Sequence, residues 1–351
     1  MKRLLSIIFG LLLVSVPLEA GAVTLRGDVD GNGTVGISDV SALIDYLLSG
    51  DASEINLENA EVSGDGLINI NDVSALIDYL LSGSWPSSKP QPTETFTANG
   101  VSFTMVLVGG GTFMMGGTEE QGTDAADDEY PVHQVTLSTF SIGQTEVTQE
   151  LWEAVMSTAI DTTFMDPEKY LYPSYFSWKN GFVDIPQRPV ENITVLKMQM
   201  FIRELNRLTG REFRLPTEAE WEFAARGGNL SKGYKYAGSN NIDEVAWYVD
   251  NAWTVGADSP DFGTHAVGTK APNELGLYDM SGNVFERTAD RAYYTYPSEP
   301  EVDPSYPIIH AGQSYSTRGG DFSIRPKYCR VSARIGIDSN AYEYVGFRLA
   351  L

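Results

Sequence analysis

The chain has a single cysteine, Cys329, in 351 residues. A lone thiol has no partner for an intramolecular disulfide, which excludes a small disulfide-stapled scaffold. Histidine is also scarce, and His133, His265 and His310 show none of the spacings that bind a metal ion. We therefore expect each histidine to be structural or exposed.

Positive charge is in short supply as well. Lys and Arg total 24 against 47 Asp and Glu, giving a net charge of −23. Nucleic acids and anionic membrane surfaces repel such a chain, so neither is the expected partner, whereas cations are favoured. Hydrophobic residues make up 42% of the chain, as in ordinary globular proteins, and the length allows two or three domains.

The one long apolar run lies at the N-terminus. Residues 4–16 follow the basic start Met1-Lys2-Arg3, and small residues at 20–22 suit a cleavage site. These are the parts of a secretory signal, and the run is shorter than the ~20 residues of a spanning helix. We predict a signal peptide at residues 1–22, no membrane span after its removal, and export to the periplasm, cell surface or medium; a membrane anchor is the alternative.

A twelve-residue segment then occurs twice. Asp39–Gly50 is repeated without change at Asp72–Gly83, with a period of 33 residues. Apolar residues recur at helical spacing in each copy, and the closing glycine is a typical helix stop. We predict two amphipathic helices, and the apolar residues of the first are Val40, Leu43, Ile44 and Leu47.

The loop before the first helix has the pattern of a calcium-binding loop. Counting from Asp28, oxygen-bearing side chains stand at positions 1, 3, 5 and 12, and Gly33 stands at the sharp turn. A hard cation with about 6 to 8 oxygen ligands requires such a set. The predicted ligands are Asp28, Asp30, Asn32, Thr34 and Asp39.

The second loop keeps the same frame with weaker ligands. Glu stands at position 1 and Ser at position 3, so we expect weaker calcium binding there. A solvated turn is the alternative for either loop. The predicted ligands are Glu61, Ser63, Asp65, Leu67 and Asp72.

The two loop-helix units, residues 25–83, resemble a type I dockerin. The resemblance implies calcium-dependent folding and docking to a cohesin-like or other exported protein. Metal binding can supply the folding free energy that a segment of this size lacks. A Pro/Ser-rich linker at residues 84–94 separates this unit from the rest of the chain.

Residues 95–351 form a Gly- and aromatic-rich domain of short strands and long loops. Three segments are predicted to be helical: Thr148–Met156, Thr194–Leu208, and a stretch from Thr217 to Gly227 that opens with a capping box. The acidic run at residues 124–129 is predicted to be a solvated loop.

Several motifs of this domain are similar to the formylglycine-generating enzyme, or sulfatase-modifying factor, superfamily. They are the segments 108–116, 146–148, 214–228, 272–284, 318–320 and 346–348. The resemblance implies an irregular mixed α+β fold related to C-type lectins, beside the small all-α dockerin-like domain.

The family chemistry converts a sulfatase cysteine to formylglycine with copper(I) held by two cysteines. In this chain Cys329 stands at the second cysteine position and Ile324 at the first. One thiolate does not make the two-thiolate site that copper(I) selects. We therefore expect no copper and no catalytic residue, Cys329 being the candidate only if the domain is an enzyme.

The resemblance also implies a calcium site in the segment 279–286. Its ligands would be the carboxylates of Asp279 and Glu286 and the backbone carbonyls of Gly282 and Val284. The second calcium site of the family is not matched at residues 246–262. Two groups of aromatics are candidates either for stacking on sugars or for packing. They are Tyr170, Tyr172, Tyr175 and Trp178, and Tyr293, Tyr294 and Tyr296.

Three functions remain open. The first is a non-catalytic, calcium-stabilised module attached to a protein partner, possibly in a polysaccharide-degrading assembly. The second is a formylglycine-generating oxidoreductase with a variant site. The third is a carbohydrate-binding component.

Overall fold

The computed structural model describes residues 25–53, 55–63, 68, 70–83, 91–159, 167–292, 295–308, 310 and 312–351. It divides into two compact units, Met1–Lys89 and Pro90–Leu351. The predicted signal peptide and residues 84–90 of the predicted linker lie outside the described residues. Within the described part, no helix is long and apolar enough to cross a membrane.

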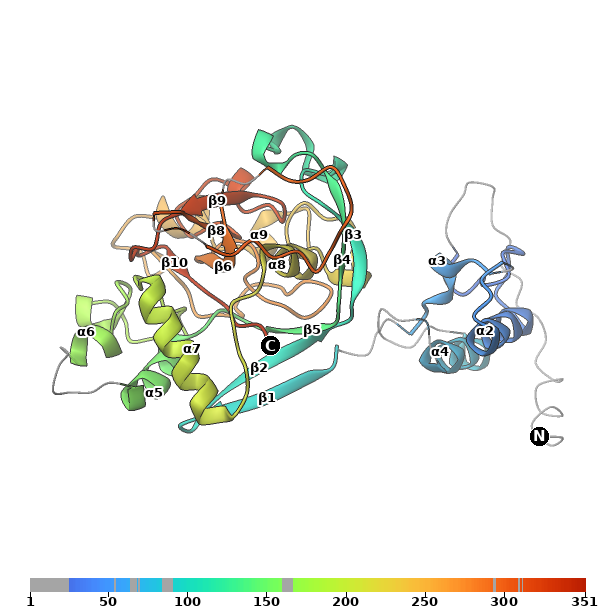
Figure 1. The fold of residues 1–351 in the computed structure, drawn as a ribbon, viewed down its shortest axis with the longest axis horizontal. Helices are drawn as coiled ribbons and strands as arrows, with labels where there is room; N and C mark the ends of the chain where they lie inside the picture. Colours follow the sequence, from blue (N-terminus) through green and yellow to red (C-terminus); the bar gives the residue numbers. More distant parts are fainter. Residues whose placement is uncertain are drawn as a thin grey trace. The chain divides into compact units, whose positions relative to one another are not determined.

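The described residues of the first unit form the two repeated helices and a short helix that lies between them in the sequence (Figure 1). They are α2 (Ile37–Ser49), α3 (Leu57–Ala60) and α4 (Ile70–Ser82). The repeated helices end alike, because Gly50 and Gly83 both have a φ of 73° and donate a backbone hydrogen bond to a tyrosine carbonyl at 2.8 Å. The two helices predicted from the repeat are confirmed.

The core of this unit repeats with the same period. Val29 corresponds to Val62 and Leu43 to Leu76, and all four are fully buried. α2 and α4 pack against each other over this core. So small a core contributes only a few kcal/mol, about 3 to 5, which leaves room for a bound ion to stabilise the unit.

Among the described residues of the second unit, three small sheets form the framework. Their strand orders are β1–β2–β5, β10–β6–β8–β9 and β3–β4–β7. The strands are β1 (Thr93–Ala98), β2 (Val101–Val108), β3 (Gly111–Met115), β4 (His133–Leu137), β5 (Phe140–Gly143), β6 (Phe285–Arg291), β7 (Glu301–Val302), β8 (Tyr315–Arg318), β9 (Arg334–Ile337) and β10 (Val345–Gly346).

The helices of this unit are α5 (Gln149–Ala159), α6 (Pro167–Leu171), α7 (Val195–Thr209), α8 (Glu218–Ala225) and α9 (Ile242–Val245). The shorter helical segments are the 3-10 helices η1 (Glu119–Asp124), η2 (Asp127–Glu129), η3 (Trp178–Asn180), η4 (Gly228–Leu230) and η6 (Pro326–Tyr328), and the π-helix η5 (Val249–Trp253). The mixed α+β class and the helical N-terminal unit agree with the prediction.

Helix starts follow the capping residues seen in the sequence. The Thr194 side chain accepts from the Lys197 N–H at 3.3 Å and caps α7. At α8, Thr217 and Glu220 accept from each other's backbone N–H at 3.1 and 2.8 Å. This capping box satisfies N–H groups that would lack partners at the helix start.

α8 lies at the centre of the second unit, between β3 and β4 on one side and β6 and β8 on the other (Figure 1). Every residue of the helix is buried, including Glu218, Glu220 and Glu222. Buried carboxylates require partners, so arginines from distant strands must approach this helix.

Candidate functional site

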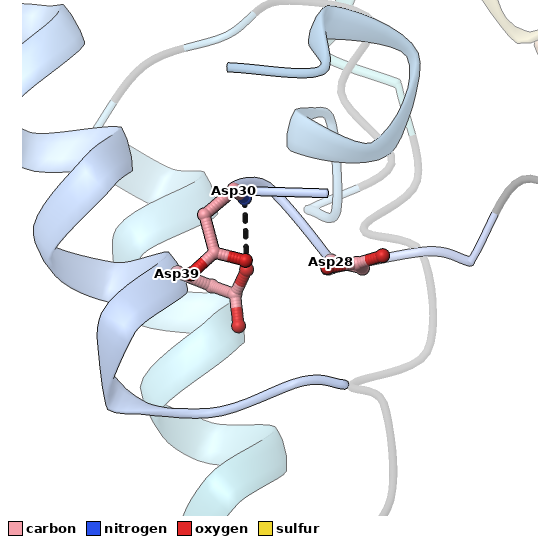
Figure 2. Close-up of side chains that lie close together, drawn as sticks. All are labelled: Asp28, Asp30 and Asp39. Atoms are coloured by element: carbon pink, nitrogen blue, oxygen red, sulfur yellow. Dashed lines mark hydrogen bonds between the residues drawn. The ribbon is translucent and has the colours of Figure 1, made fainter. Parts of the chain in front are cut away.

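The first loop brings three aspartates together (Figure 2). One carboxylate oxygen from each of Asp28, Asp30 and Asp39 lies within 4.8 Å of the others. Asp39 lies in the first turn of α2, where its Oδ2 accepts from the Gly36 N–H at 2.7 Å and its Oδ1 from the Asp30 N–H at 3.0 Å. The start of the helix thus holds Asp39 against the loop.

This cluster fits a divalent cation with oxygen ligands. Asp28 and Asp39 are buried, and Asp28 Oδ1 has no hydrogen-bond partner among the residues that the structure describes. Burial, with the charge of Asp30 as a further contribution, raises the pKa of Asp39. A calcium ion would supply the missing partner and offset the repulsion between the carboxylates. Among the described residues, no other three Asp, Glu, His or Cys side chains come together in this way.

The tip of the first loop is closed by short-range hydrogen bonds. Asn32 Nδ2 donates to Asp30 Oδ2 at 2.7 Å, and Asn32 Oδ1 accepts from the Thr34 N–H at 2.9 Å. Gly33, with a φ of 85°, donates its N–H to Asp28 Oδ2 at 3.0 Å. A left-handed residue at this point favours glycine, and it turns the loop back toward its own carboxylates. Ligation by Asn32 and Thr34 stays a prediction.

The second loop repeats one key contact of the first. Asp72, fully buried in the first turn of α4, accepts from the Val62 and Ser63 N–H groups, both at 2.8 Å. Ser63 stands one repeat after Asp30, so the two helices hold their loops alike. Ser63 Oγ also donates to Glu61 Oε1 at 3.2 Å. The predicted ligands Asp65 and Leu67 lie outside the described residues.

The candidate calcium site of the large unit contains a strong ion pair. Glu286, on β6, pairs with Gly346 of β10, which brings the C-terminal Arg348 beside it. Arg348 Nε and Nη2 donate to the two Glu286 carboxylate oxygens at 2.5 and 2.6 Å, and Trp221 Nε1 donates to one of them at 2.7 Å. Both oxygens of Glu286 therefore have protein partners.

Asp279 lies nearby and has a positive φ of 57°. Its Oδ2 accepts from the Gly268 N–H at 2.7 Å. Burial, together with the charge of Glu286, raises the pKa of Asp279 to about 6. Calcium ligation by Asp279, Glu286 and the carbonyls of Gly282 and Val284 stays a prediction.

A third carboxylate at this place was not predicted from the sequence. Glu146 is buried, and Asn283 Nδ2 donates to its Oε2 at 3.2 Å. Within the described part of the chain, its Oε1 has no hydrogen-bond partner. Burial and the charges of Asp279 and Glu286 raise its pKa well above the usual range. Its only signal in the sequence was its place in the 146–148 motif.

Cys329 lies in an apolar cluster. It is fully buried with Tyr236, Val245 and Tyr248, and Ile324 packs against the same cluster. Burial raises the pKa of its thiol. Thiolates are the species that bind copper and act as nucleophiles, and these surroundings disfavour the thiolate.

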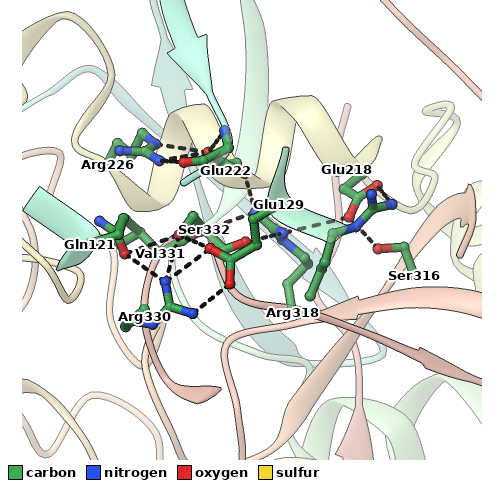
Figure 3. Close-up of polar contacts among 12 residues, drawn as sticks. Gln121, Glu129, Glu218, Glu222, Arg226, Ser316, Arg318, Arg330, Val331 and Ser332 are labelled. Carbon is green, nitrogen blue, oxygen red and sulfur yellow. Dashed lines mark hydrogen bonds and ion pairs between the residues drawn. The ribbon is translucent and has the colours of Figure 1, made fainter. Parts of the chain in front are cut away.

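Buried arginine–carboxylate pairs connect α8 to the C-terminal strands (Figure 3). Arg318 pairs with Glu222, and Arg334 Nη2 lies 2.7 Å from Glu218 Oε2. Arg226 Nε donates to Oε1 of the same Glu222 from the end of the helix, at 2.9 Å. Both carboxylates are fully buried, so these ion pairs connect parts of the structural framework.

The acidic run at 124–129 is only partly solvated. Glu129 is 1% exposed, in contrast to the prediction. Arg330 donates to both its carboxylate oxygens, with Nη1 at 2.9 Å and Nη2 at 2.5 Å, and Ser332 Oγ donates at 2.6 Å (Figure 3). These partners lie about two hundred residues away in the sequence, so the composition of the run could not reveal them.

The two aromatic groups differ in accessibility. Tyr296 is 2% exposed and lies against His133 and Arg334, so packing is its role and stacking on a sugar is excluded. Tyr293 and Tyr294 lie outside the described residues. In the other group, Tyr175 and Trp178 are 47% and 48% exposed.

The three histidines have different surroundings. His133 is buried with its Nε2 3.4 Å from Glu301, and His310 is exposed. His265 stacks on Trp247 with ring centroids 3.6 Å apart, and burial lowers its pKa to about 4.

The fold and the carboxylate loops define a two-part molecule, and comparison with known proteins identifies both parts. Residues 91–351 match the sulfatase-modifying factor enzyme 1-like domain, and residues 26–81 match the dockerin type I domain. The chain belongs to the sulfatase-modifying factor enzyme 1-like family and has a dockerin type I domain in front of it. Dockerin type I domains bind calcium, and dockerins bind cohesin partners.

Relatives of the large unit carry different names. The chaperone protein LppX of Paenibacillus barcinonensis is 35% identical over 234 residues, 57% of this chain and 75% of the relative. The formylglycine-generating enzyme of Thermomonospora curvata is 30% identical over 294 residues, 70% and 92% of the two chains. The solved structure of Treponema denticola variable protein 1 is similar with a TM-score of 0.58 and 30% identity, over 74% of this chain and 98% of that one.

Proposed function

We propose that this chain is an exported, non-catalytic binding module that its calcium-bound dockerin domain attaches to a cohesin-like partner, in an assembly that degrades polysaccharides. The observation that carries the proposal is a pair of matching apolar faces on α2 and α4. Each face has two isoleucines and one leucine, all exposed, and each of these residues on α2 has an identical residue one repeat later on α4. They are Ile37, Ile44 and Leu48 on α2, and Ile70, Ile77 and Leu81 on α4.

These faces have the features of a docking surface. Leu48 is 81% exposed and Leu81 60%, although both belong to helices whose opposite side is fully buried at Leu43 and Leu76. Exposed apolar groups arranged together on a small domain mark interaction sites. Their identity in both repeats supports a partner that recognises this particular helix face.

Calcium supports the same proposal. The carboxylates of Asp28, Asp30 and Asp39 suit a calcium ion, as does the buried Asp28 Oδ1, which no described residue hydrogen-bonds. When bound, the ion would neutralise the loop and hold the start of α2. The helix face is then presented in a fixed orientation, which reduces the entropy lost on docking.

The absence of paired thiolates supports a non-catalytic large unit. Cys329 is the only cysteine of the chain, and it lies buried among apolar side chains. The alternative is a formylglycine-generating oxidoreductase with a variant site, which would require Cys329 to be accessible to copper and to a peptide cysteine.

Docking can be tested with the full mature chain and immobilised cohesin modules, in calcium and in chelator. The double variant Leu48→Asp/Leu81→Asp should lose calcium-dependent binding. Leu196→Asp is the matched control, because Leu196 is a leucine on α7 of the other unit with 67% of its side chain exposed. Equal binding in chelator, or by the double variant, would contradict the proposal.

A further inference from the structure

A surface cavity of about 180 Å³ lies beside the N-terminal half of α5. Its other walls come from the residues after α6 and from η3. The cavity is smaller than the roughly 300–1,000 Å³ of pockets for drug-sized ligands, so it suits one small ring at a time. None of the residues discussed as calcium ligands, and neither Cys329 nor its neighbours, lines it.

The cavity has an apolar floor and an aromatic wall. Trp152 and Val190 are fully buried at the floor. Tyr172 and Trp178 form the wall, with ring centroids 5.5 Å apart and planes at 68°. Trp178 is 48% exposed, so part of its indole is accessible to a ligand.

The polar groups of the cavity include three carboxylates. Glu150, Glu153 and Asp184 line it, and among the described residues that line it there is no Lys, Arg or His. Tyr172 Oη already donates to Glu153 Oε1 at 2.6 Å, which fixes the tyrosine ring. Carboxylates accept hydrogen bonds from hydroxyl groups and repel anions.

A positively charged ligand is disfavoured in the cavity, because a lysine already lies against its aromatic wall. Lys179 Nζ lies 4.5 Å from the ring centroid of Trp178 and 5.0 Å from that of Tyr172. It also pairs with Glu168 at 3.2 Å. Lys179 thus already makes the cation–π contact that both rings can offer, and its charge would repel an amine ligand.

A half-buried amide shapes the base of the cavity. Gln149 Nε2 donates to the carbonyls of Phe176 and Pro189 at 3.1 and 3.3 Å. These bonds tie the start of α5 to the segments on either side of the cavity. Its aromatic and acidic groups are therefore held in place before a ligand arrives, which favours binding.

From this combination we propose that the cavity binds a neutral sugar ring of a glycan. The ring would lie against Trp178 with its hydroxyls donating to Glu150 and Asp184. The cavity offers two kinds of surface, an indole and carboxylates. The apolar face of a sugar ring fits the indole, and its hydroxyls fit the carboxylates. Uronic acids and sulfated sugars are excluded by the three negative charges.

The full mature chain should be titrated calorimetrically with neutral hexasaccharides of glucose, xylose, mannose and galactose. We expect binding of at least one, weakened at least tenfold in Trp178→Ala and in Asp184→Ala. Trp253→Ala is the matched control, because Trp253 is 45% exposed elsewhere on the same unit. Thermal unfolding of each variant checks that the fold is kept.

Four results would overturn this assignment: no binding of any neutral hexasaccharide at millimolar concentration, equal binding by Trp178→Ala and wild type, an equal loss in the folded Trp253→Ala control, or preferential binding of heparin fragments or choline. The assignment is independent of docking. The Leu48→Asp/Leu81→Asp variant should bind the sugar like the wild type, so failure of one proposal leaves the other standing.

Discussion

Arg348 forms a two-pronged ion pair with Glu286 inside the large unit. The two donor nitrogens lie 2.5 and 2.6 Å from the carboxylate oxygens, and both side chains are fully buried. Arg348 also donates to the carbonyls of Gly143 and Tyr278, both at 2.9 Å. One guanidinium thus connects the last residues of the chain to β5, to β6 and to the 279–286 segment.

Removal of this guanidinium should strongly destabilise the large unit. In Arg348→Met the charge of Glu286 is left buried without its partner, which costs about 3 to 5 kcal/mol. Tryptophan fluorescence during urea unfolding measures this, because residues 25–83 contain no tryptophan. Arg211→Met is the control: its pair with Glu94 is solvent-exposed, so we expect a loss of about 0 to 1 kcal/mol. Equal losses would show that the buried pair has no special role.

Asp39 should determine calcium affinity in the first loop. Asp39→Asn keeps the size of the side chain but removes one of three clustered charges, so the affinity should fall at least about tenfold. Asp45→Asn, an exposed acid on the same helix, removes the same charge and should change little. Calorimetric titration with calcium gives both values. An unchanged affinity in Asp39→Asn would exclude this loop as the site.

Cys329 should be inert in the folded protein. Because the thiol is fully buried and its pKa is raised, a disulfide reagent at pH 8 should react only after urea unfolds the chain. Copper(I) should not bind stoichiometrically, and a cysteine-containing sulfatase peptide should not be converted. Rapid reaction of the native thiol, or copper uptake that Cys329→Ser abolishes, would instead favour the oxidoreductase.

Glu191 should make stability depend on pH. Burial raises the pKa of Glu191 to about 8. The N–H groups of Phe176 and Tyr175 hydrogen-bond to its carboxylate and act to lower the pKa, but burial outweighs them. In the unfolded chain a glutamate has a pKa of about 4.3. Between these values the folded protein keeps a proton that the unfolded chain releases, so the free energy of unfolding falls as pH rises toward 8.

Glu191→Gln remains neutral at every pH and should remove this part of the slope. The free energy of unfolding of Glu191→Gln minus that of the wild type should therefore be larger at pH 8 than at pH 5. Urea unfolding followed by tryptophan fluorescence at several pH values tests this, with the exposed Glu212→Gln as control. Parallel stability curves for wild type and Glu191→Gln would contradict the prediction.

The parts predicted well depend on residues close together in the sequence. Thr194 and Thr217 cap their helices through residues three positions away, and Asp39 meets Asp30 across a loop of a few residues. Local turns place such groups almost independently of the rest of the chain. The repeated helices and the carboxylate cluster could therefore be derived from spacing alone.

The parts that were missed depend on distant segments. Glu129 has the same sequence surroundings as its exposed neighbours, and its burial is explained by the distant Arg330 and Ser332. Glu146 gains its unusual environment from Asp279 and Glu286, more than a hundred residues away. Nothing in the composition of either segment indicates which carboxylate will be covered.

The sequence by itself determined the two domain types, the calcium-type loops, the matching helices and the lack of a second thiol. Only the tertiary structure decided that Glu286 is paired with Arg348, that Tyr296 is packed inside, and that Tyr172 and Trp178 share a cavity with three carboxylates. The physical reason is the separation along the sequence of the residues that interact. A loop of twelve residues arranges its own ligands, whereas burial of a charge or opening of a cavity depends on which distant strands and helices the whole fold brings together.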